Sequence, residues 1–582
     1  MTILEKNIQA LLSGVNEPLG NKLLNFIQNK TCSRFNIDEN LNIYDKTHNV
    51  FMYENLEEEL NFFYQSILEK TPRYPFVCIY GIGNALLIKN LAKHYKHLFV
   101  FESEIELFIL ALSTIDLSEE LCSGKIYLVD IEEERVDIQL LILFDMKDMF
   151  EYLSLYEMFV NNSFYKQFCE KTWCETDEFC KKNIEIVIRD SGLNSNLSFQ
   201  SYFHFLQNIP SMLESIPFQR ILSQRKNKFD NAIVVSAGPS LAKQLPLLKA
   251  CQDKAVIFCA DGALSMLEKE GIVPDYVTNL DFTDLAMKFF QNKENKTSLN
   301  ILSCATHPNV ARSLKAENCM IVLRNKALYQ RFNFNDFGYI DTGTHVSHFS
   351  YTLALALGFK NIIMIGQDLA FDEEGNSHSK GFDFGEKFSG EENIDKLKIP
   401  AYAGKGEVLT HTTWNDYRIK LEYLFACNDQ KAKFYNATEG GARINFTEEL
   451  SFKECCEKLL TKEKPKFELP KSLTKNRSDK LLVKFKEKIQ KDQENAKRFL
   501  DDALALKQIL ENILSKDFIL PLEFLEKVYQ NIENFNHSLD EDEFIQDGIL
   551  KAVMYERGLK ISLVYKENIV DNASFITAYI KA

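Results

Sequence analysis

Long apolar runs are absent from this sequence. Its 582 residues contain no uninterrupted run of the roughly 18 apolar residues that a transmembrane helix needs, so no membrane span is predicted. The N-terminal segment MTILEKNIQALLSGVNEPLG carries acidic and amide side chains and lacks the apolar core of a signal peptide, so we expect a cytoplasmic protein. Proline and glycine are scarce, with 13 and 23 residues, which excludes collagen-like and low-complexity chains.

Basic residues are too few to balance the acidic ones. The formal net charge of −15 argues against broad non-specific binding to nucleic acid or to anionic lipid. We therefore expect no nucleic acid or membrane partner. Small polar substrates or a partner protein fit this charge better.

Paired cysteines of the C-x₂-C type are also absent. The 13 cysteines are scattered, and several lie inside apolar runs, as reduced cysteines do when they serve as small core residues. Cys169, Cys174 and Cys180 form a local group whose spacing fits a helix that carries thiols better than a zinc site. We predict no disulfide framework.

Four regions follow from the change of pattern along the chain, as expected for a length that exceeds one hydrophobic core. Residues 1–70 show helical apolar spacing and are assigned to a helical accessory region. Residues 71–225 are assigned to a Rossmann-like domain and residues 226–450 to a central α/β domain. Residues 451–582 repeat leucines at helical spacing, and their basic stretch suits a solvated helix face better than a binding site. The expected fold class is α/β, with Rossmann-like parallel sheets in the N-terminal and central domains and an all-α C-terminal domain.

The N-terminal domain opens with a βαβ pattern, FVCIYGIGNALLIKNLAKHYKHLFVFESE. Gly81 and Gly83 lie at the strand-to-helix turn, and Glu102 ends the next strand, where a ribose-binding acid lies in dinucleotide-binding folds. Leu86 stands where the third glycine of the G-x-G-x-x-G pattern would be. A scaffold with a tight turn is therefore favoured over a ligand site, although both interpretations stay open.

The central domain alternates short β-branched segments with segments of helical length. Continuous apolar strands of this kind are buried on both faces, which predicts a parallel sheet with helices on either side. The expected strands are AIVVSAG, AVIFCAD, YVTNLDF, LNILSCA, MIVLR and NIIMIGQD.

The segment NAIVVSAGPSLAKQL carries the strongest signal. A strand runs into Gly238, Pro239 and Ser240 and then into a helix. Gly238 permits close approach, Pro239 suits a first helical turn, Ser240 can cap, and free N–H groups at the helix start attract anionic oxygens. We predict a nucleotide phosphate here, but no P-loop, because no Gly-Lys-Ser/Thr follows.

Polar residues recur where the other strands of this domain end. The carboxyl ends of parallel strands line one crevice, so these side chains can form a shared site. They are Asp261 with Gly262, Asn279 with Asp281, Thr306 with His307, and Gln367 with Asp368. The run Asn279-Leu280-Asp281 loosely resembles the acidic motif of metal-dependent sugar transferases, but paired carboxylates are missing, so we expect no metal and no cofactor.

Half of the ten histidines fall in the same domain. A transferase needs a base for its acceptor hydroxyl. Each histidine, taken alone, suits a hydrogen-bonded structural position better than a catalytic one. They are His307, His345, His348, His378 and His411.

Five segments, taken in order, resemble the central domain of bacterial motility accessory factor glycosyltransferases. They are AGPSLAKQL, CADGAL, PDYVTNLDF, TGTHVSHFSYTLALALGFKNIIMIGQDLAF and NATEGGARI. The layout expected here, with a helical C-terminal domain, is similar to that family's. The same segments are similar, more distantly, to a bacterial sialyltransferase family that uses CMP-sugars. Residues 238–241 of the present sequence match the glycine turn of that family, and Asn279 matches its nucleotide-binding asparagine.

This resemblance implies transfer of a nonulosonic acid, pseudaminic or legionaminic acid, from a CMP-activated donor to a Ser or Thr hydroxyl of flagellin, as motility requires. It implies that His411, in HTTWNDYRIKLEYL, takes the hydroxyl proton during an inverting attack, while the turn at Gly238 meets the charge of the leaving CMP. The tyrosines that assist the leaving phosphate in the sialyltransferases have no match. The implied nucleotide-sugar site comprises Ser236, Gly238, Pro239, Ser240, Asp261, Gly262, Asn279, Asp281, Thr342, Gly343, Thr344, Gly366, Gln367 and Asp368.

Two other functions stay open. The central domain also resembles archaeal enzymes that transfer pyrophosphate from ATP to hydroxymethylpterin with Mg²⁺, although such a small-molecule kinase has little need of a long helical domain. A non-catalytic flagellin-binding chaperone with a degenerate transferase core would bind nucleotide without turnover.

Overall fold

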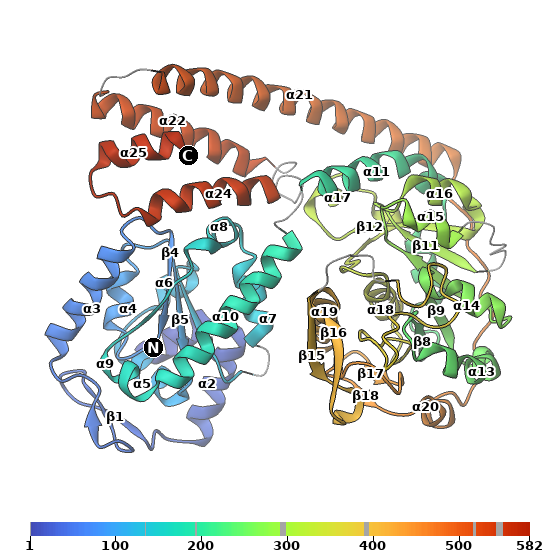
Figure 1. The fold of residues 1–582 in the computed structure, drawn as a ribbon, viewed down its shortest axis with the longest axis horizontal. Coiled ribbons are helices and arrows are strands. Elements are labelled where there is room, and N and C mark those ends of the chain that lie inside the picture. Colours follow the sequence, from blue (N-terminus) through green and yellow to red (C-terminus); the bar gives the residue numbers. More distant parts are fainter. Residues whose placement is uncertain are drawn as a thin grey trace. The chain divides into compact units, whose positions relative to one another are not determined.

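The computed structural model describes residues 2–14, 16–133, 136–191, 195–290, 298–388, 395–515, 520–542 and 551–582. The chain forms two compact units. The first comprises Met1–Ser195, Leu500–Glu541 and Leu550–Ala582, and the second is formed mainly by Asn196–Phe499. The α/β class, the two parallel sheets and the helical C-terminal region are confirmed (Figure 1). The domain boundaries at residues 70, 225 and 450 stay predictions.

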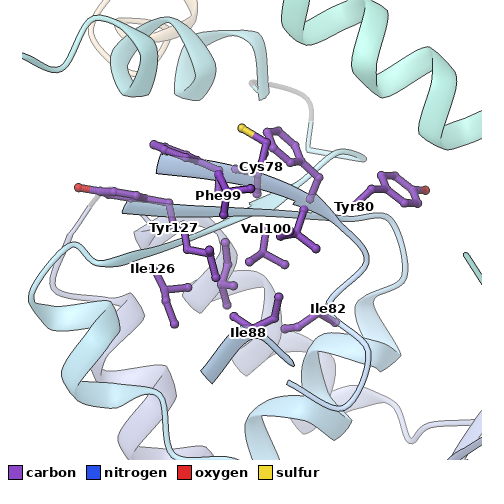
Figure 2. Packing of buried hydrophobic residues seen from close by; sticks show 14 of the residues in the cluster. Cys78, Tyr80, Ile82, Ile88, Phe99, Val100, Ile126 and Tyr127 are labelled. Carbon is purple, nitrogen blue, oxygen red and sulfur yellow. The ribbon is translucent and has the colours of Figure 1, made fainter. Parts of the chain in front are cut away.

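The first unit is built on a four-stranded parallel sheet with the order β6-β5-β4-β7. β4, β5 and β6 are buried along their whole length, as their continuous apolar sequences predict. In Figure 2, Cys78, Phe99 and Tyr127 come from these neighbouring strands, and the rings of Phe99 and Tyr127 stack with centroids 5.1 Å apart. The strands are β4 (Phe76–Tyr80), β5 (His97–Glu102), β6 (Ile126–Asp130) and β7 (Met158–Val160).

The N-terminal segment begins with two helices and ends with a third, as its apolar spacing predicts. Between them, the polar segment folds as a three-stranded antiparallel sheet, in which the Arg34 guanidinium lies 2.9 Å from the buried Asp45 carboxylate. The elements are α1 (Ile3–Leu11), α2 (Glu17–Asn29), β1 (Phe35–Ile37), β2 (Ile43–Asp45), β3 (Val50–Phe51) and α3 (Leu56–Lys70). Helices then alternate with the parallel strands: α4 (Leu86–Leu91), α5 (Ile105–Thr114), α6 (Ser118–Cys122), α7 (Val136–Phe144), α8 (Lys147–Phe150), α9 (Ser163–Phe168) and α10 (Glu170–Ser191).

The C-terminal helices α22 (Leu522–Glu541), α24 (Lys551–Lys566) and α25 (Asn572–Lys581) belong to this first unit and share an apolar core. Arg557 of α24 forms an ion pair with Glu151, and a β-carbon at Gly558 would collide with the Glu151 carbonyl. Arg73 lies 3.8 Å from the centroid of the Phe575 ring. Side chains far apart in sequence therefore tie these helices to the α/β part of the unit. Among the described residues, no helix is both long and apolar enough to cross a membrane.

The second unit contains a nine-stranded, fully parallel sheet with the order β13-β12-β11-β10-β9-β8-β14-β17-β18. All six strands expected from the sequence are present, as β8 to β12 and β14. The strands are β8 (Asn231–Val235), β9 (Val256–Ala260), β10 (Tyr276–Asn279), β11 (Leu299–Ser303), β12 (Cys319–Arg324), β13 (Tyr339–Ile340), β14 (Asn361–Ile365), β17 (Lys433–Asn436) and β18 (Glu448–Glu449).

Helices cover this sheet because both of its faces are apolar. Ala232 and Val234 of β8 pack with residues of α12, α18 and α19, whereas their neighbours Ile233 and Val235 are equally buried on the opposite face. The remaining elements of the unit connect the strands or extend from the sheet. They are α11 (Ser195–Glu214), α12 (Phe218–Arg225), α13 (Leu241–Cys251), α14 (Leu264–Lys269), α15 (Leu285–Phe290), α16 (Pro308–Ser313), α17 (Ala327–Gln330), α18 (Val346–Leu357), the hairpin β15 (Lys396–Pro400) and β16 (Glu407–His411), α19 (Thr412–Ala426), α20 (Phe452–Lys458) and the first part of α21 (Lys475–Leu514).

Each parallel sheet has a topological switch point, where the chain reverses its direction of growth across the sheet. In the second unit the strands run outward from β8 to β13, and then β14, β17 and β18 continue on the other side of β8. In the first unit the corresponding point lies between β4 and β7. Open parallel sheets bind ligands at the carboxyl ends of the strands at such points, so a ligand site is expected at one or both of these places.

Candidate functional site

The switch point of the second unit holds a cavity of about 220 Å³. The turns after β8 and β14, the start of α18 and part of α19 surround it. Its polar lining comes from Ser236, Asp261, His345, Ser347, Gln367 and Asp368. Ligand pockets commonly measure about 300–1,000 Å³, so the cavity as it stands is smaller than a typical small-molecule site.

Gln367 is fixed at the floor of the cavity by two hydroxyl groups. Its Oε1 accepts hydrogen bonds from Ser236 Oγ at 2.8 Å and from Tyr351 Oη at 3.3 Å, and Ser236 Oγ is also 2.7 Å from Ser347 Oγ. Both partners donate to the amide oxygen, so the amide nitrogen Nε2 is left as a donor. No acceptor for it is found within the described ranges.

The turn at Gly238 is folded as predicted, but its N–H groups are not free. Gly238 N donates to the Gly366 carbonyl at 2.8 Å, Ser240 N to Asp368 Oδ2 at 3.2 Å, and Ala242 N to Ser379 Oγ at 3.0 Å. The expectation of an open helix start is therefore corrected: the chain's own carboxylate and hydroxyl already satisfy these donors.

Glycine is required at position 238 because other parts of the chain, and not a ligand, lie against it. A β-carbon at Gly238 would collide with the Asp368 carboxylate and would lie 2.5 Å from the Gly366 carbonyl oxygen. α13 begins at Leu241, so Pro239 precedes the N-cap, Ser240, whose hydroxyl donates to Asp368 Oδ2 at 2.7 Å instead of capping the helix.

Asp368 has a strongly perturbed carboxyl group. Burial raises its pKa from 3.8 to about 6, although hydrogen bonds from the Ser240 hydroxyl and backbone and the charge of Lys243 favour its ionised form. Its carboxylate therefore gains or loses its proton close to neutral pH.

The remaining polar strand ends bind mainly to one another. Asn279 Nδ2 donates to the Asp261 carboxylate, Thr306 Oγ1 donates to the Asn279 carbonyl at 3.1 Å, and His307 N donates to the Asp281 carbonyl at 3.1 Å. The buried Asn279 Oδ1 has no hydrogen-bond partner within the described part of the chain. Asp261 alone of these residues lines the cavity.

The open helix start at this cavity belongs to α18. Its N-cap, His345, accepts the His348 N–H at Nδ1 over 3.3 Å, so the neutral ring carries its proton on Nε2. Burial lowers the pKa of His345 well below 6.5, which keeps the ring neutral. The N–H groups of Val346 and Ser347, which line the cavity, have no acceptor among the residues that the structure describes. A neutral imidazole donor and two backbone donors thus meet at one helix start, a geometry that suits an anionic group.

The predicted residues just before α18 support this helix start without reaching the cavity. Thr342 Oγ1 accepts a hydrogen bond from Arg324 Nε at 3.1 Å, and Gly343 N donates to Asp341 Oδ1 at 2.9 Å. Gly343 has a φ of +61°, and a β-carbon there would collide with the His348 ring. Thr344 leads directly into His345.

Aromatic side chains form another part of the cavity lining, called here the aromatic wall. The rings of His378 and Phe382 stack with centroids 3.9 Å apart, and the ring of Tyr417 stacks on His345 at 4.7 Å. Phe289 and Trp414 complete this wall. Burial lowers the pKa of His378 to about 4, so it too is neutral at pH 7.

His411, the predicted base, lies beside the cavity without lining it. It ends β16, is 3% exposed, and has its ring centroid 4.1 Å from that of Trp414, which does line the cavity. Burial lowers the pKa of His411 to about 4. Neither ring nitrogen has a hydrogen-bond partner in the described structure, so the neutral ring keeps a nitrogen that can accept a proton.

The structure thus divides the predicted site residues into two groups. Those that line the cavity are Ser236, Gly238, Asp261, Gly262, Gly366, Gln367 and Asp368. Those that lie outside its lining are Pro239, Ser240, Asn279, Asp281, Thr342, Gly343, Thr344 and His411. The prediction missed Ser347, Trp414, Tyr417 and the aromatic wall. Histidine is not a usual N-cap, so the sequence carried no clear signal for the α18 helix start.

The switch point of the first unit is filled by the chain's own side chains. Tyr165 Oη donates to Glu102 Oε2 at 2.6 Å and accepts the Gly83 N–H at 3.1 Å, and Asn161 Nδ2 donates to the Gly81 carbonyl at 3.0 Å. A β-carbon at Gly81 would collide with the Tyr165 ring. These contacts favour the scaffold interpretation of the glycine turn over a ligand site.

A metal site is not evident in the ranges that the structure describes, where no group of three or more His, Cys, Asp or Glu side chains is placed to hold an ion. This applies also to Cys169, Cys174 and Cys180, of which Cys180 is buried in the core of the first unit and Cys174 is exposed.

Two comparisons with known proteins gave a match, one to part of the second unit and one to the whole chain. Residues 203–374, less than a third of the chain but including the polar wall of the cavity, match the model of a family described as 6-hydroxymethylpterin diphosphokinase MptE-like. The fold is similar to the MAf glycosyltransferase from Magnetospirillum magneticum AMB-1, with a TM-score of 0.52 and 16% sequence identity over 100% of this chain and 95% of that one. At this identity the likeness shows the fold alone. A search of the curated proteins found no match.

Proposed function

We propose that the protein is a glycosyltransferase that binds a nucleotide-sugar donor in the cavity between the ends of β8 and β14. The observation that carries this proposal is the contrast between the two switch points: one holds a cavity lined by converging polar and aromatic groups, and the other is filled. The fold shared over the whole chain with a glycosyltransferase supports the same conclusion.

We propose a CMP-activated nonulosonic acid, pseudaminic or legionaminic acid, as the donor, and a Ser or Thr hydroxyl of flagellin as the acceptor. The five ordered motifs of the central domain support this choice. Such a donor carries a phosphate and a carboxylate, and the start of α18 offers donors for one of these anions at His345, Val346 and Ser347. Gln367, which also lines the cavity, supplies a further donor with its Nε2.

The transfer breaks the bond between the anomeric carbon and the phosphate oxygen and forms one to the acceptor oxygen. CMP leaves with the bonding electrons, and a base removes the hydroxyl proton. His411 is the base that the family resemblance implies, and in the described structure its neutral ring has no hydrogen-bond partner at either nitrogen. Asp368 is the alternative base because its carboxyl group lines the cavity and is ionised above about pH 6.

Isothermal titration of the full chain with CMP, CDP, ATP and GTP, each with and without Mg²⁺, tests the donor class. We expect CMP to bind without Mg²⁺, and Gln367→Ala and Gly238→Asp to weaken or abolish this binding. Lys398→Ala, on the exposed side of the β15 and β16 hairpin, serves as the control. Failure of the wild-type protein to bind any cytidine nucleotide would overturn the donor assignment.

The match of residues 203–374 supports one alternative, a diphosphokinase that acts on a pterin with ATP and Mg²⁺. The cavity carboxylates of Asp261 and Asp368 are the type of ligand that Mg²⁺ prefers. Binding of ATP that depends on Mg²⁺, with no response to CMP, would favour this function. Binding of CMP without any transfer to flagellin would instead favour the non-catalytic chaperone.

A further inference from the structure

Two cysteines of the second unit face each other across a helix pair. Cys251 is the last residue of α13 and is 5% exposed, and Cys456 lies within α20 and is half-buried. Their Sγ atoms are 3.6 Å apart, with the Cys456 thiol donating to the Cys251 sulfur. The two residues are 205 positions apart in sequence, so a bond between them would link distant parts of the unit.

The distance between these sulfurs is short enough for a disulfide to form with small movements. A disulfide needs a separation of about 2.0 Å, so the two sulfurs must approach by roughly 1.5 Å. Because α13 and α20 already pack together, rotation of the side chains and a small shift of α20 supply this approach. The S–H of Cys456 and the charge of Lys254 lower the pKa of Cys251, which favours a thiolate on one side of the pair.

The start of α13 touches Asp368 directly, and the start of α20 is linked to Asp368 through residues 439–442. The N-cap of α13, Ser240, donates two hydrogen bonds to the Asp368 carboxylate. α20 starts after Ser451, and the N–H of its first residue, Phe452, donates to Glu439 Oε1 at 3.2 Å. The segment that holds Glu439 lies against Asp368, because Ala442 N donates to the Asp368 carbonyl at 2.7 Å.

We propose that Cys251 and Cys456 form a reversible disulfide that clamps α20 to α13 and restrains residues 437–442 behind Asp368. A peroxide oxidises one thiol to a sulfenic acid and is itself reduced to water. The sulfur of the second cysteine then attacks the sulfenic sulfur, and the oxygen leaves as a second molecule of water. The balance is two thiols and one hydrogen peroxide giving one disulfide and two waters, and a free thiol such as glutathione reverses it.

Thiol mapping of the full-length protein tests this proposal. The protein is treated with hydrogen peroxide, its free thiols are alkylated, and a non-reducing digest is analysed by mass spectrometry. We expect a linked peptide that joins Cys251 to Cys456, its loss after dithiothreitol, and its absence in Cys456→Ser. Cys427→Ser, which removes an exposed cysteine, should leave the link intact.

Hydrogen exchange tests the clamp itself. Oxidation should raise the Tm and slow amide exchange in residues 437–442 of the wild-type protein, and neither change should occur in Cys456→Ser. Alkylation of both Cys251 and Cys456 after peroxide treatment, while Cys122, Cys174 or Cys427 is oxidised, would overturn the disulfide. A linked peptide without slower exchange in residues 437–442 would overturn the restraint behind Asp368. The thiol mapping is performed on the wild-type protein, so its result stands even if Cys456→Ser fails to fold.

Discussion

Asp368 accepts hydrogen bonds from both the backbone N–H and the hydroxyl of Ser240, at 3.2 and 2.7 Å. A carboxylate of the chain thus occupies the helix start that a phosphate was expected to fill. Among the described residues, donors without a partner remain at Gln367 Nε2 and at the start of α18, the helix that leads into β14, the neighbour of β8 in the sheet. The glycine turn after β8 therefore shapes the cavity, whereas the start of α18 is the better candidate for binding an anion.

Gly238→Ala tests how tightly this turn is packed. The added β-carbon meets the Asp368 carboxylate and the Gly366 carbonyl, neither of which can move without breaking a hydrogen bond. We expect the free energy of unfolding to fall by about 1–3 kcal/mol, as overpacking usually costs. Urea denaturation measures this change. Gly14→Ala is the control, since a β-carbon there meets nothing within 4 Å.

Asp368 should make stability depend on pH. Its pKa is raised from 3.8 to about 6 in the folded protein, so the folded state binds the proton more tightly than the unfolded chain does. Asp368 therefore contributes its full stabilisation below about pH 4. As the pH rises to about 6, the free energy of unfolding falls by on the order of 3 kcal/mol. Asp368→Asn removes this loss, so its stability relative to wild type should increase between pH 4 and 7.

Unfolding curves at several pH values measure the effect of Asp368. The exposed Asp479→Asn serves as the matched control and should follow the wild-type curve. Parallel pH profiles for wild type and Asp368→Asn would contradict a buried Asp368 that titrates near neutral pH.

Much of the fold could be predicted because its signals are local. The strands β8 to β12 are short apolar segments bounded by turns, and each appears where its sequence places it. β13 and β18 span two residues each and exist only as partners of a neighbouring strand, so no local pattern marks them. The accessory strands β1 to β3 depend on contacts such as that between Arg34 and Asp45, which a polar segment does not reveal.

The site could be predicted only in part for a similar reason. Strand ends converge in any parallel sheet, which correctly brings Ser236, Asp261 and Asp368 together. Whether a donor at such an end is free depends on long-range partners. Ser240 and Asp368 are 128 residues apart, so the sequence could not show that the phosphate turn is already occupied.

His345→Asn separates capping from ligand binding at α18. Asparagine caps helices well, so the variant should keep the stability of wild type, but it lacks the Nε2 donor of the imidazole. We expect CMP-sugar affinity to fall about tenfold, the effect of one hydrogen bond to a charged group. Titration calorimetry measures the affinity, and His537→Asn, at an exposed position on α22, is the control. Unchanged affinity would place the anion elsewhere in the cavity.

His411→Gln tests the predicted base. Removal of a general base lowers kcat by about 10²–10⁴-fold, whereas donor affinity should change little because His411 does not line the cavity. Transfer of the sugar to purified flagellin, followed by intact-protein mass spectrometry, measures the rate. Transfer at the wild-type rate by His411→Gln, together with loss of transfer in Asp368→Asn, would assign the base to Asp368 instead.

Tyr165→Phe tests whether the filled crevice of the first unit is structural. The phenol oxygen joins Glu102 to the Gly83 backbone, and burial raises the pKa of both Tyr165 and Glu102 above their ordinary values. Loss of this hydroxyl leaves a buried carboxyl and a backbone N–H each without one partner, which should lower the free energy of unfolding by about 1–3 kcal/mol. Tyr44→Phe, at a partly buried position of β2 whose phenol bonds to the Asn49 side chain, is the control. A structural role predicts that Tyr165→Phe leaves CMP affinity unchanged and that wild type binds neither NAD nor S-adenosylmethionine. Binding of either ligand by wild type would mean that a nucleotide can displace the Tyr165 side chain from the switch point of the first unit.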